Sequence, residues 1–326
     1  MQIVILDDYQ DAVRGLECFA TLDGHAVTVY NDPPINRNEL VARLQNAEAV
    51  VLIRERTTID DELLVRLPRL ALISQTGKIS NHLDLEACSA RGVFVAEGVG
   101  SPVAPAELCW ALIMAAERRI PQYCSELKEG RWQSARGVGI GRALGGHTLG
   151  IWGYGKIGRL VAGFGRAFGM KILVWGRNAS LSAAAADGYE ALRDKRSLFE
   201  ESDVLSLHLR LNDVTQGCVT LDDLRAMKSD ALFVNTSRAE LVEPGALHAA
   251  LSSGRPGSAA IDVFEKEPIT DANHPLLLMD NVVCTPHLGY VEQAGYELYF
   301  EKAFQNIVAF AAGSPQNIAN PTATRK

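Results

Sequence analysis

The sequence predicts an α/β protein with two doubly wound parallel sheets, and three observations point to that class. Its 326 residues exceed the roughly 250–300 at which a single hydrophobic core stops growing, so we expect two domains. Short apolar runs of strand length recur along the chain, and stretches with helical periodicity separate most of them. That alternation is typical of βαβ units, whose parallel strands are covered on both faces. The predicted strands are Ile3–Leu6, Ala49–Ile53, Ala71–Ile73, Val93–Ala96, Leu149–Trp152, Ile172–Trp175, Val204–Leu207, Ala231–Val234 and Ala259–Val263.

The domain boundary is predicted at Glu97–Pro102, where glycine and proline interrupt regular structure. A long helix follows it, from about Val103 to Arg118. The last predicted helix, Glu292–Ala312, has no strand left to cover in the preceding sheet, so we expect it to return to the first domain. The expected division is a discontinuous domain of residues 1–98 plus 291–326, a second domain of residues 99–290, and a cleft between them.

Composition argues against several classes of protein. Hydrophobic residues make up 47% of the chain and charged residues 22%, which is typical of a folded globular protein. The formal charge of −7 argues against nucleic acid as a partner, because that affinity comes largely from Lys and Arg. The longest apolar segment, Leu108–Ala116, is far shorter than the roughly 20 residues of a membrane helix. We expect no nucleic-acid partner and no membrane partner.

The first residues and the cysteines indicate a cytoplasmic protein. Residues 1–8 lack the basic start and long apolar stretch of a signal peptide and resemble a first buried strand. The six cysteines lie far apart without a CxxC pair, which suits a reducing compartment better than a disulfide framework. We interpret them as small core residues. They are Cys18, Cys88, Cys109, Cys124, Cys218 and Cys284.

A glycine-rich loop connects the predicted strand Leu149–Trp152 to a predicted helix, Arg159–Phe168. In its GxGxxG pattern the glycines provide a tight turn, close approach of the backbone to a pyrophosphate, and close packing of helix and strand. The pyrophosphate then binds at the helix N-terminus. The pattern alone also fits a glycine-rich turn, but the strand before it and the helix after it favour a Rossmann domain with a dinucleotide cofactor. The loop residues are Gly153, Tyr154, Gly155, Lys156, Ile157 and Gly158.

The end of the second strand of this domain bears on the choice of dinucleotide. An Asp or Glu that binds the ribose 2′-hydroxyl is expected about 20 residues after the loop. Gly176 stands there instead, and Arg177 follows it. The missing carboxylate removes repulsion against a 2′-phosphate, and a guanidinium group suits one. We expect an NAD(P) cofactor, with NADP(H) favoured over NAD(H). The alternative is a surface arginine beside a site that accepts either cofactor.

Three later segments accompany this loop, namely Val234–Arg238, Ile261–Pro268 and Cys284–Gly289. Together with the loop and Pro105-Ala106-Glu107, they closely resemble the D-isomer-specific 2-hydroxy-acid dehydrogenase family, which includes phosphoglycerate dehydrogenases and glyoxylate/hydroxypyruvate reductases. The resemblance is strongest from Ala104 to Gly289 and looser before it. It implies an enzyme that transfers a hydride between NAD(P)(H) and a small D-2-hydroxy acid or 2-keto acid. It also implies a flavodoxin-like substrate domain and a homodimer.

By the same resemblance, Arg238, Glu267 and His287 would be the catalytic residues. Arg238 would bind the substrate carboxylate and polarise the carbonyl, because a guanidinium makes bidentate bonds to carboxylates. His287 would be the acid-base group, since histidine titrates near neutral pH, and Glu267 would fix its tautomer. Taken singly, a surface cation, a solvated loop carboxylate and a core histidine explain the same residues. Their joint appearance after strands of a dinucleotide-binding sheet favours catalysis.

The resemblance further implies cofactor contacts from His208, Thr236 and Asp262. Asp262 resembles the family's contact to the nicotinamide amide, with a helix-cap or loop-bonding role as the alternative. Arg210 stands where the family has proline, and both a cofactor phosphate contact and solvation explain it. The histidines outside these segments show no paired ligand spacing, so we expect no metal.

The first domain departs from the family in the segment Gln75–Ser80. Family members carry a Gly-x-Gly turn there, whose backbone amides hold the substrate carboxylate. Gly77 is kept here, but Ile79 replaces the second glycine. We expect Gly77 and Lys78 to bind substrate, with Lys78 as a second cation, and a solvated loop lysine is the alternative. Arg54 follows a predicted strand and either faces the cleft or forms a salt bridge with Glu55 or a neighbouring acid.

Two other functions stay open at this point. A dinucleotide-sensing binding protein could use the same fold, and a same-fold dehydrogenase could act on another small anion such as formate or phosphite. The intact catalytic set argues against the dinucleotide sensor. Dehydrogenation of an anion such as formate or phosphite does not need an acid-base histidine. The predicted helix Val103–Arg118 contains the apolar residues Trp110, Leu112 and Met114. These residues form either a contact between subunits or part of the core of the chain.

Overall fold

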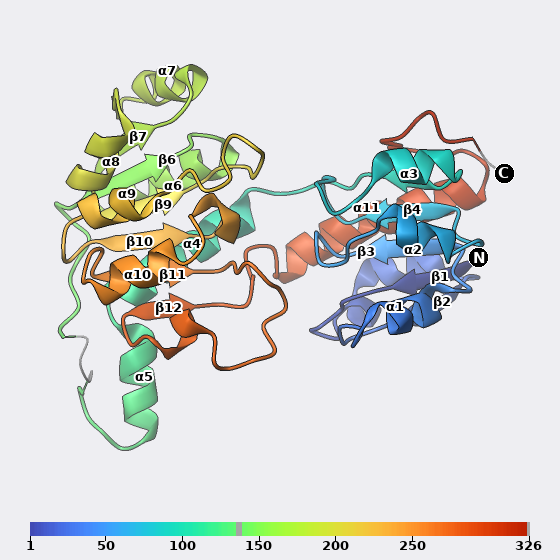
Figure 1. Ribbon diagram of the computed structural model, residues 1–326, viewed down its shortest axis with the longest axis horizontal. Helices are drawn as coiled ribbons and strands as arrows, with labels where there is room; N and C mark the ends of the chain where they lie inside the picture. The colour runs from blue at the N-terminus through green and yellow to red at the C-terminus, as the bar shows by residue number, and fades with distance from the viewer. Residues whose placement is uncertain (135–138, 325–326) are drawn as a thin grey trace. The chain divides into compact units, whose positions relative to one another are not determined.

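The computed structural model describes residues 1–134 and 139–324. The chain divides into two units, both drawn in Figure 1. Unit 1 is Met1–Ser101 together with Glu292–Lys326, and unit 2 is Pro102–Val291. The chain therefore leaves unit 1 once and returns to it with its last helix.

Unit 1 contains a five-stranded parallel sheet in the order β2-β1-β3-β4-β5. This order is that of flavodoxin-like folds. The central strand β3 is buried along its whole length, which explains why its sequence is a continuous apolar run. The strands are β1 (Gln2–Ile5), β2 (Ala26–Val29), β3 (Ala49–Leu52), β4 (Leu72–Gln75) and β5 (Phe94–Ala96). The helices are η1 (Val13–Gly15), η2 (Glu17–Leu22), α1 (Arg37–Leu44), α2 (Asp61–Val65), α3 (Leu85–Ala90) and α11 (Gln293–Ala311).

Unit 2 contains a seven-stranded parallel sheet in the order β12-β11-β10-β9-β6-β7-β8. Counted from β6, this is the 3-2-1-4-5-6 order of a Rossmann fold with one further strand. The strands are β6 (Thr148–Trp152), β7 (Lys171–Trp175), β8 (Glu190–Ala191), β9 (Val204–Leu207), β10 (Leu232–Asn235), β11 (Ser258–Ile261) and β12 (Val282–Cys284). The helices are α4 (Val103–Glu117), α5 (Ile120–Lys128), α6 (Lys156–Ala167), α7 (Asn178–Ala186), α8 (Lys195–Glu201), α9 (Leu221–Ala226), η3 (Ala239–Leu241), α10 (Ala246–Ser252) and η4 (Pro275–Leu278). Both sheets confirm the predicted fold class.

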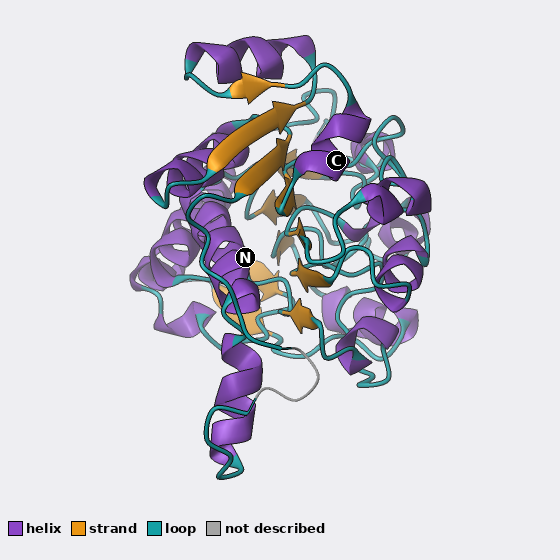
Figure 2. Ribbon diagram, turned by 90° about the vertical axis from the view of Figure 1, so that its left-hand side faces the viewer, coloured by secondary structure: helices purple, strands orange, loops and turns teal. Residues whose placement is uncertain are grey.

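Neighbouring residues of each unit 2 strand enter two separate cores, because successive side chains of a strand point to opposite faces. In β6, Leu149 and Ile151 belong to the core that α4 and α6 cover, whereas Trp152 belongs to the core that α8, α9 and α10 cover. Figure 2 shows helices on both sides of the strands. This double covering places the carboxyl ends of β6, β9, β10 and β11 along one edge, where the loops of the site begin.

The last helix completes unit 1. Helix α11 packs against β4 and η2, and Phe300, Phe304 and Ile307 are almost fully buried there. The hydroxyl of Ser74 in β4 donates to the carbonyl of Ala303 at 2.8 Å. A buried face of the first sheet is thus covered by a helix that lies some two hundred residues further along the chain.

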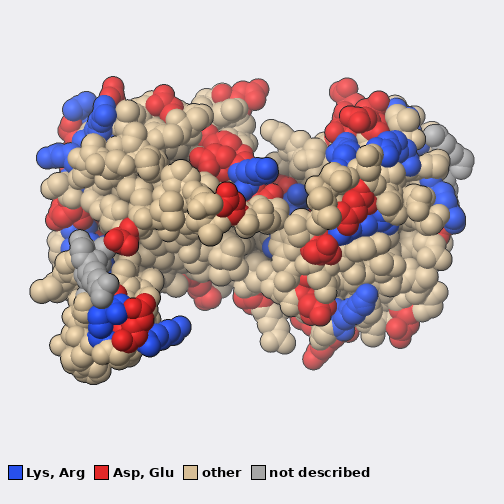
Figure 3. Space-filling view, turned by 60° about the horizontal axis from the view of Figure 1, so that its bottom comes forward, with Lys and Arg blue, Asp and Glu red and all other residues tan. Residues whose placement is uncertain are grey.

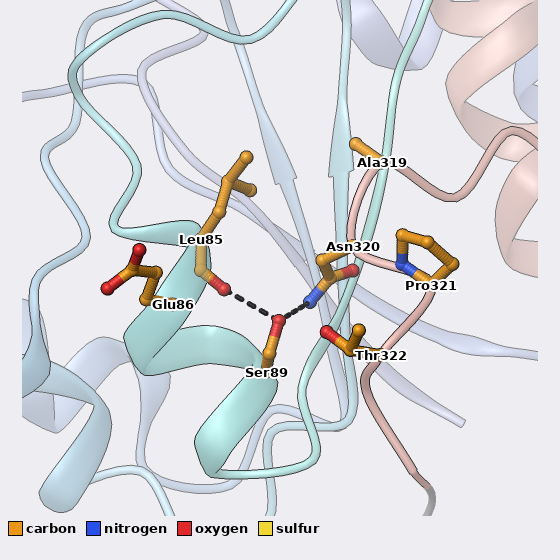
Figure 4. A pocket seen from close by; sticks show the side chains of 7 residues that line it. All are labelled: Leu85, Glu86, Ser89, Ala319, Asn320, Pro321 and Thr322. Atoms are coloured by element: carbon orange, nitrogen blue, oxygen red, sulfur yellow. Dashed lines mark hydrogen bonds between the residues drawn. The ribbon is translucent and has the colours of Figure 1, made fainter.

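Residues beyond α11 pair with the edge of the same sheet. Ile318 forms an antiparallel bridge with Ala96 of β5. The buried amide of Asn320 accepts from Val95 N at 2.8 Å and donates to Ser89 Oγ at 3.1 Å, the second bond being drawn in Figure 4. The backbone groups at this edge are therefore satisfied by the chain itself.

Strands β2, β8 and β12 are absent from the sequence-based prediction. Edge strand β2 has only exposed and half-buried residues, so its sequence lacks the continuous apolar run of a covered strand. Strand β8 has two residues and β12 has three, too few for a recognisable pattern. The six cysteines are free, but Cys124 is exposed, which corrects its interpretation as a core residue.

Two features of the surface bear on partners. On the face drawn in Figure 3, Lys and Arg side chains are interspersed with Asp and Glu. Within residues 1–134 and 139–324, no helix combines the length and the apolar character that a membrane crossing requires.

Candidate active site

Residues 153–158 form the turn that connects β6 to α6. Gly153 has φ +100°, a conformation that favours glycine, and a Cβ there would overlap the carbonyl oxygen of His208. A Cβ at Gly158 would overlap the carbonyl oxygen of Gly153. Gly155, the N-cap of α6, faces open space instead, so the helix N-terminus is accessible to an anion. This arrangement fits the pyrophosphate of a dinucleotide.

The other residues of the loop have different surroundings. The side chain of Tyr154 is buried. Its hydroxyl donates to Asp187 Oδ2 at 2.6 Å, and its ring packs edge-on against Tyr189. Only its backbone is left for a cofactor. Lys156 is exposed in the first turn of α6, and Ile157 packs partly into the core.

The end of β7 carries the residues that bear on the ribose of a dinucleotide. Arg177 is the N-cap residue of α7 and is exposed. A Cβ at Gly176 would lie 3.7 Å from Gly153 N and 3.7 Å from Ser180 Oγ. A side chain at this position would therefore stand beside the first glycine of the loop, and glycine leaves no carboxylate there.

His208 lies against the phosphate loop, and a Cβ at Gly158 would be 3.3 Å from its Cδ2. Its Nε2 is 3.0 Å from Ser206 Oγ, which in turn is 3.3 Å from the buried thiol of Cys109. Thr236 also hydrogen-bonds this thiol. Burial lowers the pKa of His208 to about 4, so the ring is neutral near pH 7 and donates no proton as a cation.

Arg238, Glu267 and His287 come together at the carboxyl ends of the unit 2 strands. His287 Nδ1 lies 2.6 Å from Glu267 Oε2, and Glu267 Oε1 accepts from Phe264 N at 2.9 Å. Burial alone would raise the pKa of Glu267. The hydrogen bond and charge of His287, the Phe264 amide and the Arg238 guanidinium outweigh burial and lower that pKa. Arg238 Nη1 donates to the carbonyl of Ser237 at 2.6 Å, which fixes the guanidinium in this group.

Asp262 holds the loop that carries His287. Its Oδ1 accepts from Thr285 Oγ1 and from Leu288 N, both at 2.7 Å, and its Oδ2 accepts from Gly289 N at 2.9 Å. His287 itself has φ +53°, a backbone conformation that is uncommon outside glycine. Burial raises the pKa of Asp262 despite these hydrogen bonds. Both carboxylate oxygens are thus engaged by the loop, which is the loop-bonding role weighed from the sequence.

On unit 1, Gly77 and Lys78 lie in the loop after β4. Lys78 Nζ is 2.5 Å from Glu97 Oε2, and the other oxygen of this carboxylate accepts from Ile79 N at 3.1 Å. The Lys78 side chain is 68% exposed. A Cβ at Gly77 would overlap Nη1 of Arg54, so the Arg54 guanidinium lies against this glycine. Two cations, Arg54 and Lys78, therefore border the loop, and Lys78 is paired with Glu97.

A separate hollow lies in unit 1 between α3 and the C-terminal segment, and Figure 4 shows it. Glu86 is the one ionisable side chain among the residues that line it. The hollow contains no candidate acid-base pair. Its lining residues are Leu85, Glu86, Ser89, Ala319, Asn320, Pro321 and Thr322.

Comparison with known proteins decides between the classes of function. Residues 110–289, more than half of the chain, match the NAD-binding domain of D-isomer-specific 2-hydroxyacid dehydrogenases. The chain belongs to this family.

The chain is similar to individual members of the family. It is 37% identical over 299 residues to glyoxylate reductase of Aeropyrum pernix, with 89% of this chain and 88% of that protein covered. It is 34% identical over 256 residues to D-3-phosphoglycerate dehydrogenase of Methanocaldococcus jannaschii, with 78% of this chain and 48% of the relative covered. The crystal structure of phosphoglycerate oxidoreductase from Vibrio cholerae O395 is 58% identical, with a TM-score of 0.94 over 96% of this chain and 99% of that one.

Membership of the 2-hydroxyacid dehydrogenase family sets the class of reaction. The matched domain indicates a nicotinamide dinucleotide cofactor, and the family transfers a hydride between that cofactor and a 2-hydroxy acid. The chain is therefore an oxidoreductase of this type. The dinucleotide sensor and the dehydrogenase of another small anion are not favoured.

Some neighbours of the dehydrogenase site are absent from the sequence-based prediction. Ser206 lies in β9 and His208 directly follows that strand, so the strand period of two predicts that both side chains point to the same side. In the sequence, Glu97 is only part of the predicted domain boundary. Its contact with Lys78 depends on the pairing of β4 with β5, which a local pattern does not encode.

Proposed function

We propose that this protein reduces small 2-keto acids to D-2-hydroxy acids, with His287 as the acid-base group. The observation that carries the proposal is the 2.6 Å contact between His287 Nδ1 and Glu267 Oε2, together with the lowered pKa of Glu267. An ionised carboxylate at Nδ1 keeps a proton on that nitrogen. Nε2 is then the nitrogen that exchanges a proton with substrate.

The proposed roles of the neighbouring groups follow from their chemistry. When bound on unit 2, the reduced dinucleotide supplies the hydride. Arg238 pairs with the substrate carboxylate and draws electron density from the carbonyl. His287 donates its proton to the carbonyl oxygen as the alcohol forms, and Glu267 compensates the charge of the ring. We assign His208, which lies against the phosphate loop, and Thr236 to the cofactor site, while Asp262 holds the segment that carries His287.

A panel of 2-keto acids with NADPH and NADH in parallel tests the proposal. We expect reduction of at least one of glyoxylate, hydroxypyruvate or phosphohydroxypyruvate. His287→Ala should lower kcat/KM by about 10²–10⁴-fold, the usual contribution of a positioned acid-base group. Absence of keto-acid reduction by the wild-type protein would contradict the function, and full activity of His287→Ala would contradict the role of the histidine.

We further propose that NADP(H) is preferred over NAD(H). The support is local: Gly176 offers no carboxylate beside Gly153, and Arg177 is exposed at the N-cap of α7. A 2′-phosphate there would gain a guanidinium partner and meet no repulsion. Arg177→Ala should reduce kcat/KM for NADPH far more than for NADH, and Gly176→Asp should reverse the preference. A wild-type preference for NADH would overturn the proposal.

For the substrate, we propose that Gly77 and Lys78 of unit 1 bind its anionic part. Lys78 is paired with Glu97, so its charge is available to a substrate only if that exposed ion pair exchanges. Arg54 is the second cation at this loop. Lys78→Ala should raise KM for the keto acid without changing the affinity for cofactor. An unchanged KM would leave Arg54 as the cation that matters.

We also propose a homodimer in which α5 contributes to the interface. Leu112 of α4 is buried in the core of unit 2, and Trp110 and Met114 are half-buried and pack against that core. Helix α5, by contrast, buries none of its own residues, and it extends from unit 2 in Figures 1 and 2. Leu127 of α5 is 56% exposed, and Trp132, which follows the helix, is 78% exposed. Sedimentation velocity should give a dimer for the wild type and a monomer for Trp132→Asp, and a monomeric wild type would refute the interface.

A further inference from the structure

Arg54 has an unusual backbone conformation that its surroundings hold in place. It follows β3 with φ +57°, in the left-handed region that non-glycine residues seldom adopt. Its amide donates to Thr76 Oγ1 at 3.1 Å, and its carbonyl accepts from Gln75 Nε2 at 2.7 Å. Such a conformation persists only when neighbouring groups fix it, and it commonly marks a functional position.

The Gln75 amide is itself fixed in one orientation. Because its Nε2 donates to Arg54, its Oε1 is the atom that faces His82 Nε2, at 3.3 Å. An amide oxygen only accepts, so Nε2 of His82 is the nitrogen that carries a proton. Gln75 is fully buried, Thr76 is 1% exposed and His82 is 7% exposed. Water does not readily replace these bonds, and breaking one leaves a buried polar group unsatisfied.

The Arg54 side chain lies against the loop that follows β4. A Cβ at Gly77 would overlap Nη1 of Arg54 and lie 3.3 Å from its Cζ. The guanidinium therefore lies in the place that any other residue at 77 would fill. Strands β3 and β4 are neighbours with Leu52 opposite Gln75, so their carboxyl ends bring both loops to one edge of the sheet. Ligands of open α/β sheets bind at that edge.

We propose that Gln75 and His82 are positioning residues that hold Arg54 in place as an anion-binding group of unit 1, beside Gly77 and Lys78. This inference rests on the proposed function, in which unit 1 receives the anionic part of a keto acid. The loop has Ile79 where a second glycine would allow an amide cradle, and a fixed guanidinium takes over that task. Preorganisation of this kind strengthens binding without changing the proton transfer at His287.

A double-mutant cycle tests the inference. Gln75→Leu removes the donor to the Arg54 carbonyl, and we expect about a tenfold rise in KM for the keto acid with kcat little changed, as one lost hydrogen bond can account for. In an Arg54→Ala background the same substitution should have no further effect on KM. The dissociation constant of oxalate, an unreactive dianion, should follow the KM values, while that of the cofactor stays constant.

Two pairs of control variants, at His82 and at Arg54, separate the loss of the hydrogen bond and of the guanidinium from other effects of substitution. His82→Gln keeps a donor toward Gln75 and should behave like wild type, whereas His82→Leu should resemble Gln75→Leu. Arg54→Gly accepts the left-handed conformation without strain and should show the same KM as Arg54→Ala, which assigns the effect to the guanidinium. An equal rise in KM with and without Arg54, or a fall in kcat alone, would overturn the positioning role. Lack of keto-acid reduction by the wild type would instead overturn the proposed function, and oxalate binding would still test the network.

Discussion

Because His208 is neutral in the folded chain, we predict that the folded state loses stability as the pH falls below 6.5. Burial lowers its pKa from the ordinary 6.5 to about 4 in the folded chain. As the pH falls through 6.5, the unfolded chain takes up a proton on this ring and the folded chain does not. The folded state therefore loses stability from about pH 6.5 down to about pH 4 and loses no more below that.

The size of the effect follows from the same two pKa values. The difference between 6.5 and about 4, at about 1.36 kcal/mol for each pKa unit, corresponds to roughly 3 kcal/mol in full. Between pH 7.5 and pH 5 the integrated loss is about 2 kcal/mol, because His208 is then almost entirely protonated in the unfolded chain and still mostly neutral in the folded one.

The assay compares wild type with His208→Gln, whose amide still reaches the hydroxyl of Ser206 but does not titrate. Urea unfolding at several pH values from 7.5 to 5 should show the stability of the variant rising relative to wild type by about 2 kcal/mol. His248→Gln, a substitution at an exposed position of α10, controls for loss of a histidine. A stability difference between wild type and His208→Gln that stays constant with pH would refute the reasoning.

Three further predictions concern other parts of the dehydrogenase. Asp262→Asn places an amide N–H against Gly289 N–H and should displace the His287 loop, which should lower kcat/KM by about 10–100-fold. A rise in the KM for the cofactor with kcat unchanged would instead favour a contact of Asp262 with the nicotinamide. Because the pKa of Glu267 is lowered from 4.5, its carboxylate stabilises the fold fully above pH 4.5, and the stability advantage over Glu267→Gln should shrink only as pH falls below that value. Gly150→Ala should destabilise by about 1–3 kcal/mol in urea unfolding, since its Cβ would overlap Ser202 Oγ. Gly163→Ala, where a Cβ meets open space on α6, should instead stabilise by about 0.5–1 kcal/mol, and similar values for the two glycines would contradict the packing argument.

The sequence carried much of the site because the relevant patterns are local. Glycine spacing in the 153–158 loop reflects contacts within one strand–turn–helix unit, so the tight turn at Gly153 was foreseeable. Arg238, Glu267 and His287 each follow a strand, and parallel strands deliver their carboxyl ends to one edge. The sheet order therefore brings together residues that are far apart in the chain.

Side-chain orientation and long-range partners were not foreseeable in the same way. Tyr154 belongs to the loop by sequence, but its hydroxyl donates to Asp187 at the C-cap of α7, 33 residues further along the chain, and no local pattern reports this contact. The engagement of Gln75 by His82 depends on how a loop folds back beside β4. The left-handed backbone of Arg54 has no sequence signal at all, since arginine is not a residue that favours it.

The return of α11 to unit 1 has a consequence for synthesis. Unit 2 is one continuous stretch, and all of its strands emerge from the ribosome before α11 does. Residues 1–101 emerge first, yet the buried hydroxyl of Ser74 lacks its acceptor and β4 lacks its aromatic cover until residues 300–307 arrive. The part of the chain made first is therefore the part completed last, and during that interval the bare face of its sheet is the surface that a chaperone would bind.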